Sequence, residues 1–155
     1  MKLAIKYGAI IAAGIAVWVV ADHTLLHITR PGSRVSLLTP IFFNLLQFVV
    51  LFLGIRARRL ERRGSITMRQ GIGTGMAISL AYAVLSSIFF ALLYLAIGSR
   101  LLENESTPFG ANQSEGQVLI GAFAGLFFGA LFGGLIYSVV ISFALRGDPR
   151  SPART

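Results

Sequence analysis

VLIGAFAGLFFGALFGGLIYSVVISFAL, residues 118–145, contains no Asp, Glu, Lys or Arg. A helix needs about 20 apolar residues to cross the roughly 30 Å hydrocarbon core of a bilayer, and this stretch is longer than that. A backbone in lipid must satisfy its own hydrogen bonds, which a helix does within a single segment. The stretch therefore predicts a transmembrane helix.

Three further apolar runs precede it, at about residues 3–28, 35–55 and 72–97. Hydrophobic residues make up 55% of the 155-residue chain and charged residues 13%, against about 25% charged in soluble domains. A soluble fold of this size could not bury so much apolar surface. We expect one all-α domain, residues 1–145, built as a bundle of four transmembrane helices, and a disordered cytoplasmic tail, residues 146–155.

The first run has an alternative interpretation as a secretory signal. Lys2 and Lys6 precede an apolar core, and Val19-Val20-Ala21 resembles a signal-peptidase site. Cleavage there would leave three helices. We expect the segment to be retained as the first transmembrane helix.

The Lys and Arg residues predict the orientation, because cytoplasmic loops of membrane proteins are enriched in them. Most of the 14 Lys and Arg residues lie at the N-terminus, in residues 56–69 or in the tail. The expected outer segments hold only Arg30, Arg34 and Arg100. Both termini are therefore expected on the cytoplasmic side.

Composition also excludes several function classes. The net charge is +8, but the charges lie in short blocks between apolar runs and not on one soluble face, so we expect no nucleic-acid partner. The chain has no cysteine, which excludes disulfides, thiolate metal sites and cysteine nucleophiles. No catalytic or nucleotide-binding pattern is present, and we expect a protein that is not an enzyme and carries no cofactor.

The most regular pattern is a glycine zipper in the fourth helix, in which a glycine recurs every four residues. Its members are Gly121, Gly125, Gly129 and Gly133. The third helix repeats the spacing with small residues, among them Gly71, Gly75 and Ser79. Residues four apart share a helix face, and small side chains let backbones approach closely. The two stripes are expected to serve helix packing, either against each other or with one of them facing a second protomer; a pore is the alternative.

Two amide side chains, Asn44 and Gln47, are expected near the middle of the second helix. Amides inside a membrane need hydrogen-bond partners. The expected role is hydrogen bonding between helices. The alternative is a lining for the path of a polar substrate or ion.

A second polar group lies at the outer end of the first helix: Asp22, His23 and His27. The two histidines are four apart and could face one way, so a metal site is the alternative interpretation. Adjacent side chains on a helix point about 100° apart, however, which keeps Asp22 and His23 from converging. We expect a hydrogen-bonded or ion-paired Asp22 and no metal site.

The segment between the second and third helices is strongly basic. Its arginines are expected to attract anionic lipid headgroups, at about 1 kcal/mol for each basic residue near the surface. They are Arg56, Arg58, Arg59, Arg62 and Arg63. The alternative is that they serve only as the orientation signal.

Several short patterns together resemble a known family. Lys6-Tyr7-Gly8 leads into the first helix, Trp18, Asp22 and His27 stand at its outer end, and Ile66-Thr67-Met68-Arg69-Gln70-Gly71 with Gly75 opens the third helix. The chain resembles, over about residues 1–100, a bacterial family of small four-helix membrane proteins catalogued as a domain of unknown function. That family has Glu at the position of Asp22. The resemblance implies the bacterial inner (plasma) membrane and no assigned activity.

The expected function is that of a non-enzymatic accessory or scaffold protein that acts through helix packing in the bilayer. Its partners would be further copies of itself or another membrane protein. The alternative is a small transporter or channel subunit, with a polar path near Asn44, Gln47 and Asp22.

Overall fold

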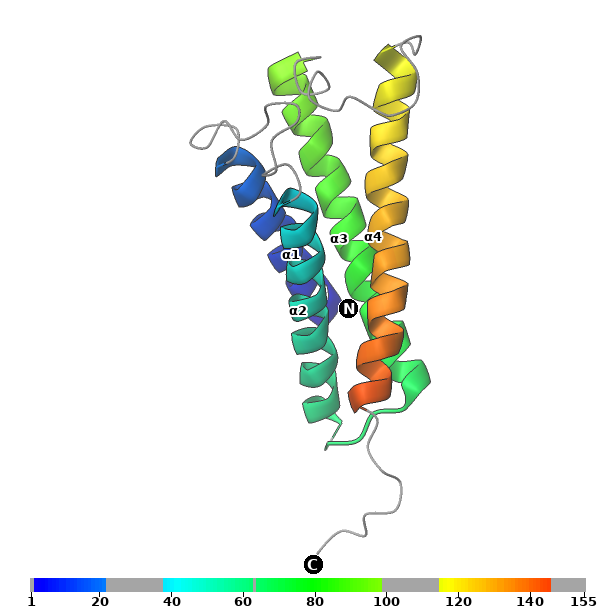
Figure 1. Cartoon of the computed structure of the whole chain (residues 1–155). Helices are drawn as coiled ribbons and strands as arrows, with labels where there is room; N and C mark the ends of the chain where they lie inside the picture. The colour runs from blue at the N-terminus through cyan, green and yellow to red at the C-terminus, as the bar shows by residue number, and fades with distance from the viewer. Residues whose placement is uncertain (1, 22–37, 63, 99–114, 146–155) are drawn as a thin grey trace, which may run out of the picture.

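The computed structural model (Figure 1) describes residues 2–21, 38–62, 64–98 and 115–145, and these residues form helices without any strand. The helices are α1 (Lys2–Ala21), α2 (Leu38–Glu61), α3 (Met68–Ile97) and α4 (Glu115–Leu145). All four are long and apolar enough to cross a membrane. The predicted all-α bundle is confirmed, and the chain is a multi-pass membrane protein.

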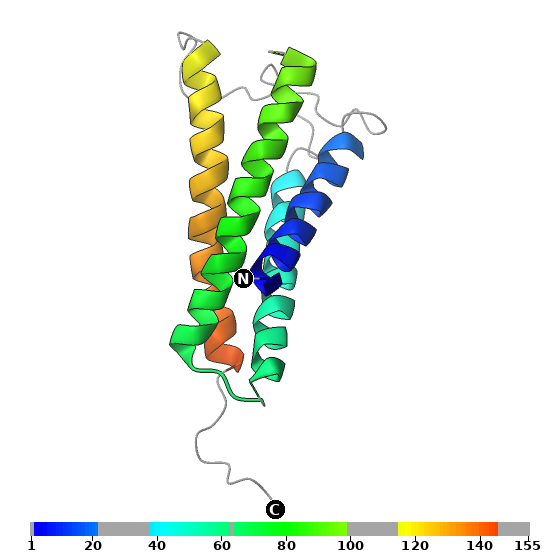
Figure 2. The ribbon, with the colours of Figure 1, turned by 180° about the vertical axis from the view of Figure 1, so that it is seen from behind.

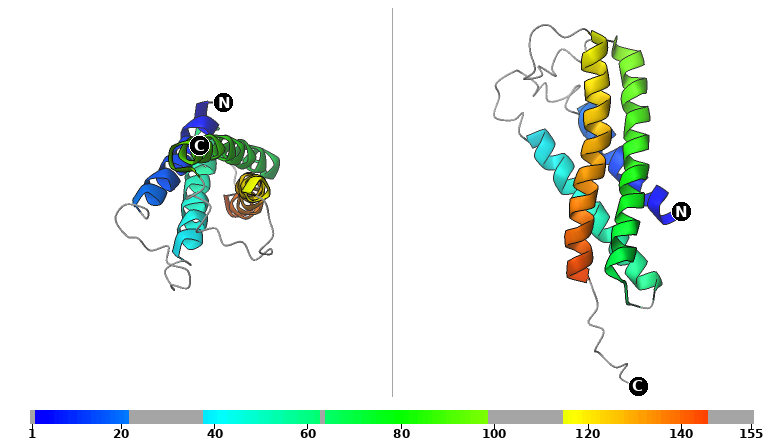
Figure 3. Two further views of the ribbon diagram at one scale, coloured as in Figure 1. Left: turned by 90° about the horizontal axis from the view of Figure 1, so that it is seen from above. Right: turned by 90° about the vertical axis from the view of Figure 1, so that its right-hand side faces the viewer.

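The helices run alternately up and down (Figures 1 and 2). Helices α1 and α3 begin, and α2 and α4 end, toward one end of the bundle; we call it the basic end, because the arginines at the end of α2 lie there. Helix α1 begins further into the bundle than α2 reaches at this end (Figure 3). The last turns of α2 and the first turns of α3 therefore extend beyond the start of α1.

The helices at the basic end are longer than the apolar runs that predicted them. Helix α2 continues from the expected end at residue 55 to Glu61, and α3 begins at Met68 and not at residue 72. Arginine is a good helix former, so the hydrogen-bonded helix continues where the hydrophobic run stops. Three expectations lie outside the described residues. They are the continuation of α1 to residue 28, the start of α2 at residue 35 and the tail.

The connection between α2 and α3 is short and held by specific hydrogen bonds. Arg59 Nε donates to the carbonyl of Gly64 at 2.8 Å, and Gly64 has a positive φ of 86°. Thr67 and Gln70 then form a capping box: the Gln70 amide N donates to Thr67 Oγ1 at 3.3 Å, and Thr67 N donates to Gln70 Oε1 at 3.4 Å. Such a box satisfies backbone N–H groups that a helix start leaves free.

The core contains branched aliphatic side chains from all four helices. The largest fully buried ones are Ile11, Leu51, Ile55, Ile78 and Ile141. The outward surface is apolar too: Leu95 is 79% exposed and Ile120 71% exposed. A lipid bilayer would cover these exposed apolar side chains along the length of the helices.

Helix α1 approaches the backbone of α3 at Gly8. A Cβ added there would lie 2.7 Å from Ala81 Cβ and 2.9 Å from the Tyr82 backbone N. No other residue type leaves room for this crossing. Gly8 therefore sets how closely α1 sits on α3.

Candidate functional site

The predicted acidic and histidine group follows the last described residue of α1. Helix α1 ends at Ala21, one turn after Trp18, whose ring stacks on Phe42 with centroids 4.3 Å apart. Asp22, His23 and His27 lie outside the described residues. Among the residues that are described, no cluster of His, Cys, Asp or Glu could hold a metal ion.

Gln47 is buried between α2 and α4. Its side chain is 6% exposed, and Nε2 donates to the backbone carbonyl of Ala130 at 2.9 Å. A Cβ added at Gly133 would lie 3.4 Å from Gln47 Oε1, so the missing side chain at Gly133 gives the amide its space. The geometry matches the predicted hydrogen bond between helices.

Asn44 lies one turn earlier on α2 and is exposed. Its Nδ2 donates to the carbonyl of Pro40 at 2.7 Å, and Tyr137 on α4 donates from its hydroxyl to Asn44 Oδ1 at 2.7 Å. The Tyr137 ring meets Phe48 edge-on, with centroids 5.6 Å apart. The structure therefore separates the two predicted amides: Gln47 is buried in the bundle, and Asn44 forms an exposed polar pair with Tyr137.

The contact between α3 and α4 near the basic end is a seam in which glycine on one helix meets serine on the other. A Cβ added at Gly71 would overlap Ser142, and one added at Gly75 would overlap Ser138. One helical turn further along the contact, the glycine is on α4 and the serine is on α3, because a Cβ on Gly134 would overlap Ser79. Each step of four along α3 is matched by a step of four back along α4, so the two backbones stay close. We call these three pairs the glycine–serine seam.

The glycine stripe of α4 takes no part in this seam. A Cβ added at Gly121, Gly125 or Gly129 meets no atom of the described chain within 4 Å, and all three residues are exposed. Only Gly133 has a neighbour, the side chain of Gln47. The small residues Gly71, Gly75 and Ser79 of α3 do pack against α4, as one of the two predictions has it. Their partners on α4, however, lie closer to its C-terminal end than the predicted glycine stripe.

Two physical reasons separate the stripe from the seam. Residues four apart advance by about 40° around a helix, so one stripe cannot face the same neighbour along its whole length. Helices α3 and α4 also diverge away from the basic end (Figures 1 and 2). At that level they meet through the rings of Phe90 and Phe123, whose centroids are 5.0 Å apart, and bulky rings hold the backbones further apart than glycine does.

Sequence reasoning missed Ser138 and Ser142 as packing residues. A signal for them was present, since both continue the four-residue spacing beyond Gly134. The Ser138 hydroxyl donates to the carbonyl of Gly134, one turn back, as serines in helices often do. The hydroxyls of Ser79 and Ser142 have no hydrogen-bond partner among the described residues. At these two levels the seam depends on the small volume of the side chains.

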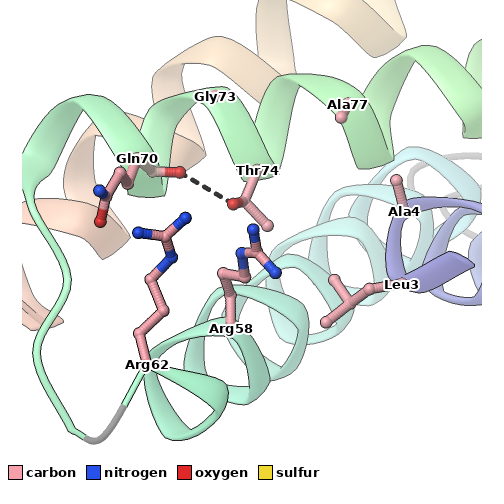
Figure 4. A pocket seen from close by; sticks show the side chains of 8 residues that line it. All are labelled: Leu3, Ala4, Arg58, Arg62, Gln70, Gly73, Thr74 and Ala77. Atoms are coloured by element: carbon pink, nitrogen blue, oxygen red, sulfur yellow. Dashed lines mark hydrogen bonds between the residues drawn. The ribbon is translucent and has the colours of Figure 1, made fainter. Parts of the chain in front are cut away.

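The predicted headgroup arginines take different positions. Arg58 and Arg62 line a cavity of about 320 Å³ at the basic end, together with residues of α1 and α3 (Figure 4). Arg59 is engaged with Gly64, and Arg56 is exposed outside the cavity lining. Arg63 lies outside the described residues.

The sequence model of a family described as "Protein of unknown function (DUF4199)" matches residues 6–147. The predicted resemblance to a family of unknown function is confirmed, and it extends past residue 100 to the end of α4. No curated protein and no solved structure matches the chain significantly.

Proposed function

The chain belongs to the DUF4199 family of proteins of unknown function, and we propose that it is a non-enzymatic membrane scaffold that acts through helix packing. The observation that carries the proposal is the unequal use of small residues on α4. Near the basic end, Gly71, Gly75 and Gly134 each face a serine of the opposite helix. Further along, Gly121, Gly125 and Gly129 form an exposed stripe of the same four-residue spacing that no described residue covers.

The partner we propose for this stripe is α4 of a second copy. Transmembrane helices associate most closely when both carry small residues at the interface, and two copies of one glycine stripe meet that condition on both sides. A two-fold symmetric contact needs only one surface, which each copy supplies. The exposed Asn44–Tyr137 pair supports a protein contact as well, because polar groups on a lipid-facing surface are costly and favour partners.

Replacing Gly125 and Gly129 together by Leu is expected to weaken self-association by about tenfold or more, since branched side chains would hold the helices apart. The fold should persist, because neither Cβ meets an atom of the described residues. Energy transfer between two labelled populations in proteoliposomes measures the association, and a thermal melt in detergent measures the fold.

The matched control is Gly116→Leu, the same change at an exposed glycine of α4 outside the stripe. It should associate like the wild type. Unchanged association of the double variant, or a wild type that stays monomeric at high protein-to-lipid ratio, would contradict the proposed self-assembly.

We also propose that the basic end faces the cytoplasm, in the inner (plasma) membrane. The chain has no cysteine, so single cysteines report topology without background. Ser65→Cys, exposed between α2 and α3, and Gly116→Cys, exposed at the opposite end, are the two probes. A membrane-impermeant maleimide should label Gly116→Cys on intact cells and Ser65→Cys only after permeabilisation. The reverse labelling would refute this orientation.

A small transporter or channel subunit is the second candidate function. The observation that favours it is the exposed amide of Asn44 within a membrane-spanning helix. Against it, Asn44 and Gln47 are both hydrogen-bonded inside the chain, and neither lines the cavity at the basic end. An Asn44→Cys variant in the same labelling series separates the two functions: reaction with a water-soluble maleimide in folded protein supports a polar path, and protection supports the scaffold.

A further inference from the structure

The cavity at the basic end is an open pocket between three helices (Figure 4). Arg58, in the last turn of α2, and Arg62, just after it, form one wall. Gln70, Gly73, Thr74 and Ala77 of α3 form the facing wall, and Leu3 and Ala4 of α1 close the side toward the bundle. The cavity exists because α2 and α3 extend beyond the start of α1 at the basic end.

Both guanidinium groups point from α2 toward α3 into this space (Figure 4). Arg58 is paired with Glu61 at 2.8 Å. Arg62 has neither a hydrogen bond nor an ion pair from its side chain to any described residue, and no acidic residue is part of the lining. The cavity therefore carries net positive charge.

The start of α1 adds to this charge. Leu3 and Ala4 belong to its first turn, and a helix start carries the positive end of the helix dipole. At the start of α3 the backbone N–H of Gln70 is already bonded to Thr67 Oγ1. The Gln70 side chain still offers N–H donors, because its hydrogen bond to Thr67 uses only Oε1.

We propose that this cavity binds a phosphoryl group. Guanidinium groups and the start of a helix both favour phosphate oxygens. The same positive charge would repel a cation. Leu3, Ala4 and Ala77 give one side of the cavity an apolar surface suited to the carbon chain of a phosphate ester. An anionic phospholipid headgroup and a soluble phosphate share this chemistry, and competition between them identifies the source.

The test uses the full chain in a neutral detergent, with phosphatidylglycerol and inorganic phosphate as probes and phosphatidylcholine as the zwitterionic reference. Binding is measured by native mass spectrometry and by the shift of the melting temperature. Arg62→Gln should weaken binding by about tenfold or more, which corresponds to the loss of one charge-assisted contact. Arg56→Gln removes an equal charge outside the lining and should change binding little.

A second variant blocks the cavity without changing its charge. A Cβ on Gly73 meets no atom within 4 Å, so Gly73→Leu should fold and project its side chain into the cavity; Gly116→Leu is its control. Both Arg62→Gln and Gly73→Leu should lose binding. Loss in Arg62→Gln alone would show attraction to surface charge and would overturn the cavity site, as would wild-type binding in both variants.

The source of the phosphate is read from the same titrations. Saturable phosphatidylglycerol binding that millimolar inorganic phosphate does not displace identifies a lipid headgroup. Stabilisation by inorganic phosphate that competes with the lipid identifies a soluble ligand. Failure of both phosphatidylglycerol and inorganic phosphate to bind would overturn the proposal.

Discussion

Gly75→Ser is expected to destabilise the bundle by about 1–3 kcal/mol, the usual cost of overpacking a close contact, and a second change, Ser138→Gly, is expected to recover much of the loss. A Cβ on Gly75 would overlap Ser138 and approach Ile55 Cδ1 to 3.3 Å. The double variant moves the serine to α3 and the glycine to α4. That arrangement already exists one level along the seam, where Ser79 faces Gly134.

The four proteins of this double-mutant cycle can be compared by thermal or denaturant unfolding in detergent, and the coupling energy is the quantity of interest. Gly121→Ser is the matched control, because it makes the same chemical change at a position where a Cβ meets no described residue within 4 Å. It should melt close to the wild type. If Gly75→Ser melts like Gly121→Ser, or if Ser138→Gly gives no rescue, the glycine–serine seam does not hold α3 against α4.

Gly8→Ala is expected to have the other large effect, a loss of about 1–3 kcal/mol of stability. The added methyl group would lie 2.9 Å from the Tyr82 backbone N and 3.1 Å from the Ile78 carbonyl oxygen. Backbone atoms cannot rotate away, so α1 must move off α3. The gain of about 1 kcal/mol in helix propensity on replacing Gly by Ala offsets only part of this cost.

The control for Gly8→Ala lies on the same helix. A Cβ on Gly14 would lie 2.7 Å from Leu46 Cδ2, which is the far end of a flexible side chain and can change rotamer. Gly14→Ala should therefore be close to neutral or slightly stabilising. Unfolding in detergent compares the two variants. Similar melting of Gly8→Ala and Gly14→Ala would show that α1 does not depend on the close approach at Gly8.

Part of the candidate site could be predicted from residue types alone. An amide in the middle of an apolar helix predicts a hydrogen bond between helices, and Gln47 makes one to the backbone of α4. Asn44 has the same side-chain chemistry, but it lies on the exposed side of α2 and bonds to Tyr137. Three positions along a helix change the direction of a side chain by about 300°, and which direction is inside depends on where α4 lies.

The capping box at the start of α3 has a recognisable sequence pattern. Thr67 followed three residues later by Gln70 is the sequence pattern of a helix start. It sets the beginning of α3 at Met68, four residues before the apolar run begins. The hydrophobic run marks where lipid begins, whereas the cap marks where the helix begins, and the two boundaries need not coincide.

The number of spans, their order and their helical form follow from the amino-acid sequence, because each segment must meet the length and hydrogen-bonding demands of a bilayer on its own. Which small residues pack against a neighbouring helix depends on the tertiary fold. Gly75 and Gly125 stand in the same four-residue pattern, yet one is filled by Ser138 and the other is open. The structure likewise decided that Arg58 and Arg62 share a cavity. Both outcomes depend on where helices cross and where a neighbour begins, which are properties of pairs of helices and not of any one segment.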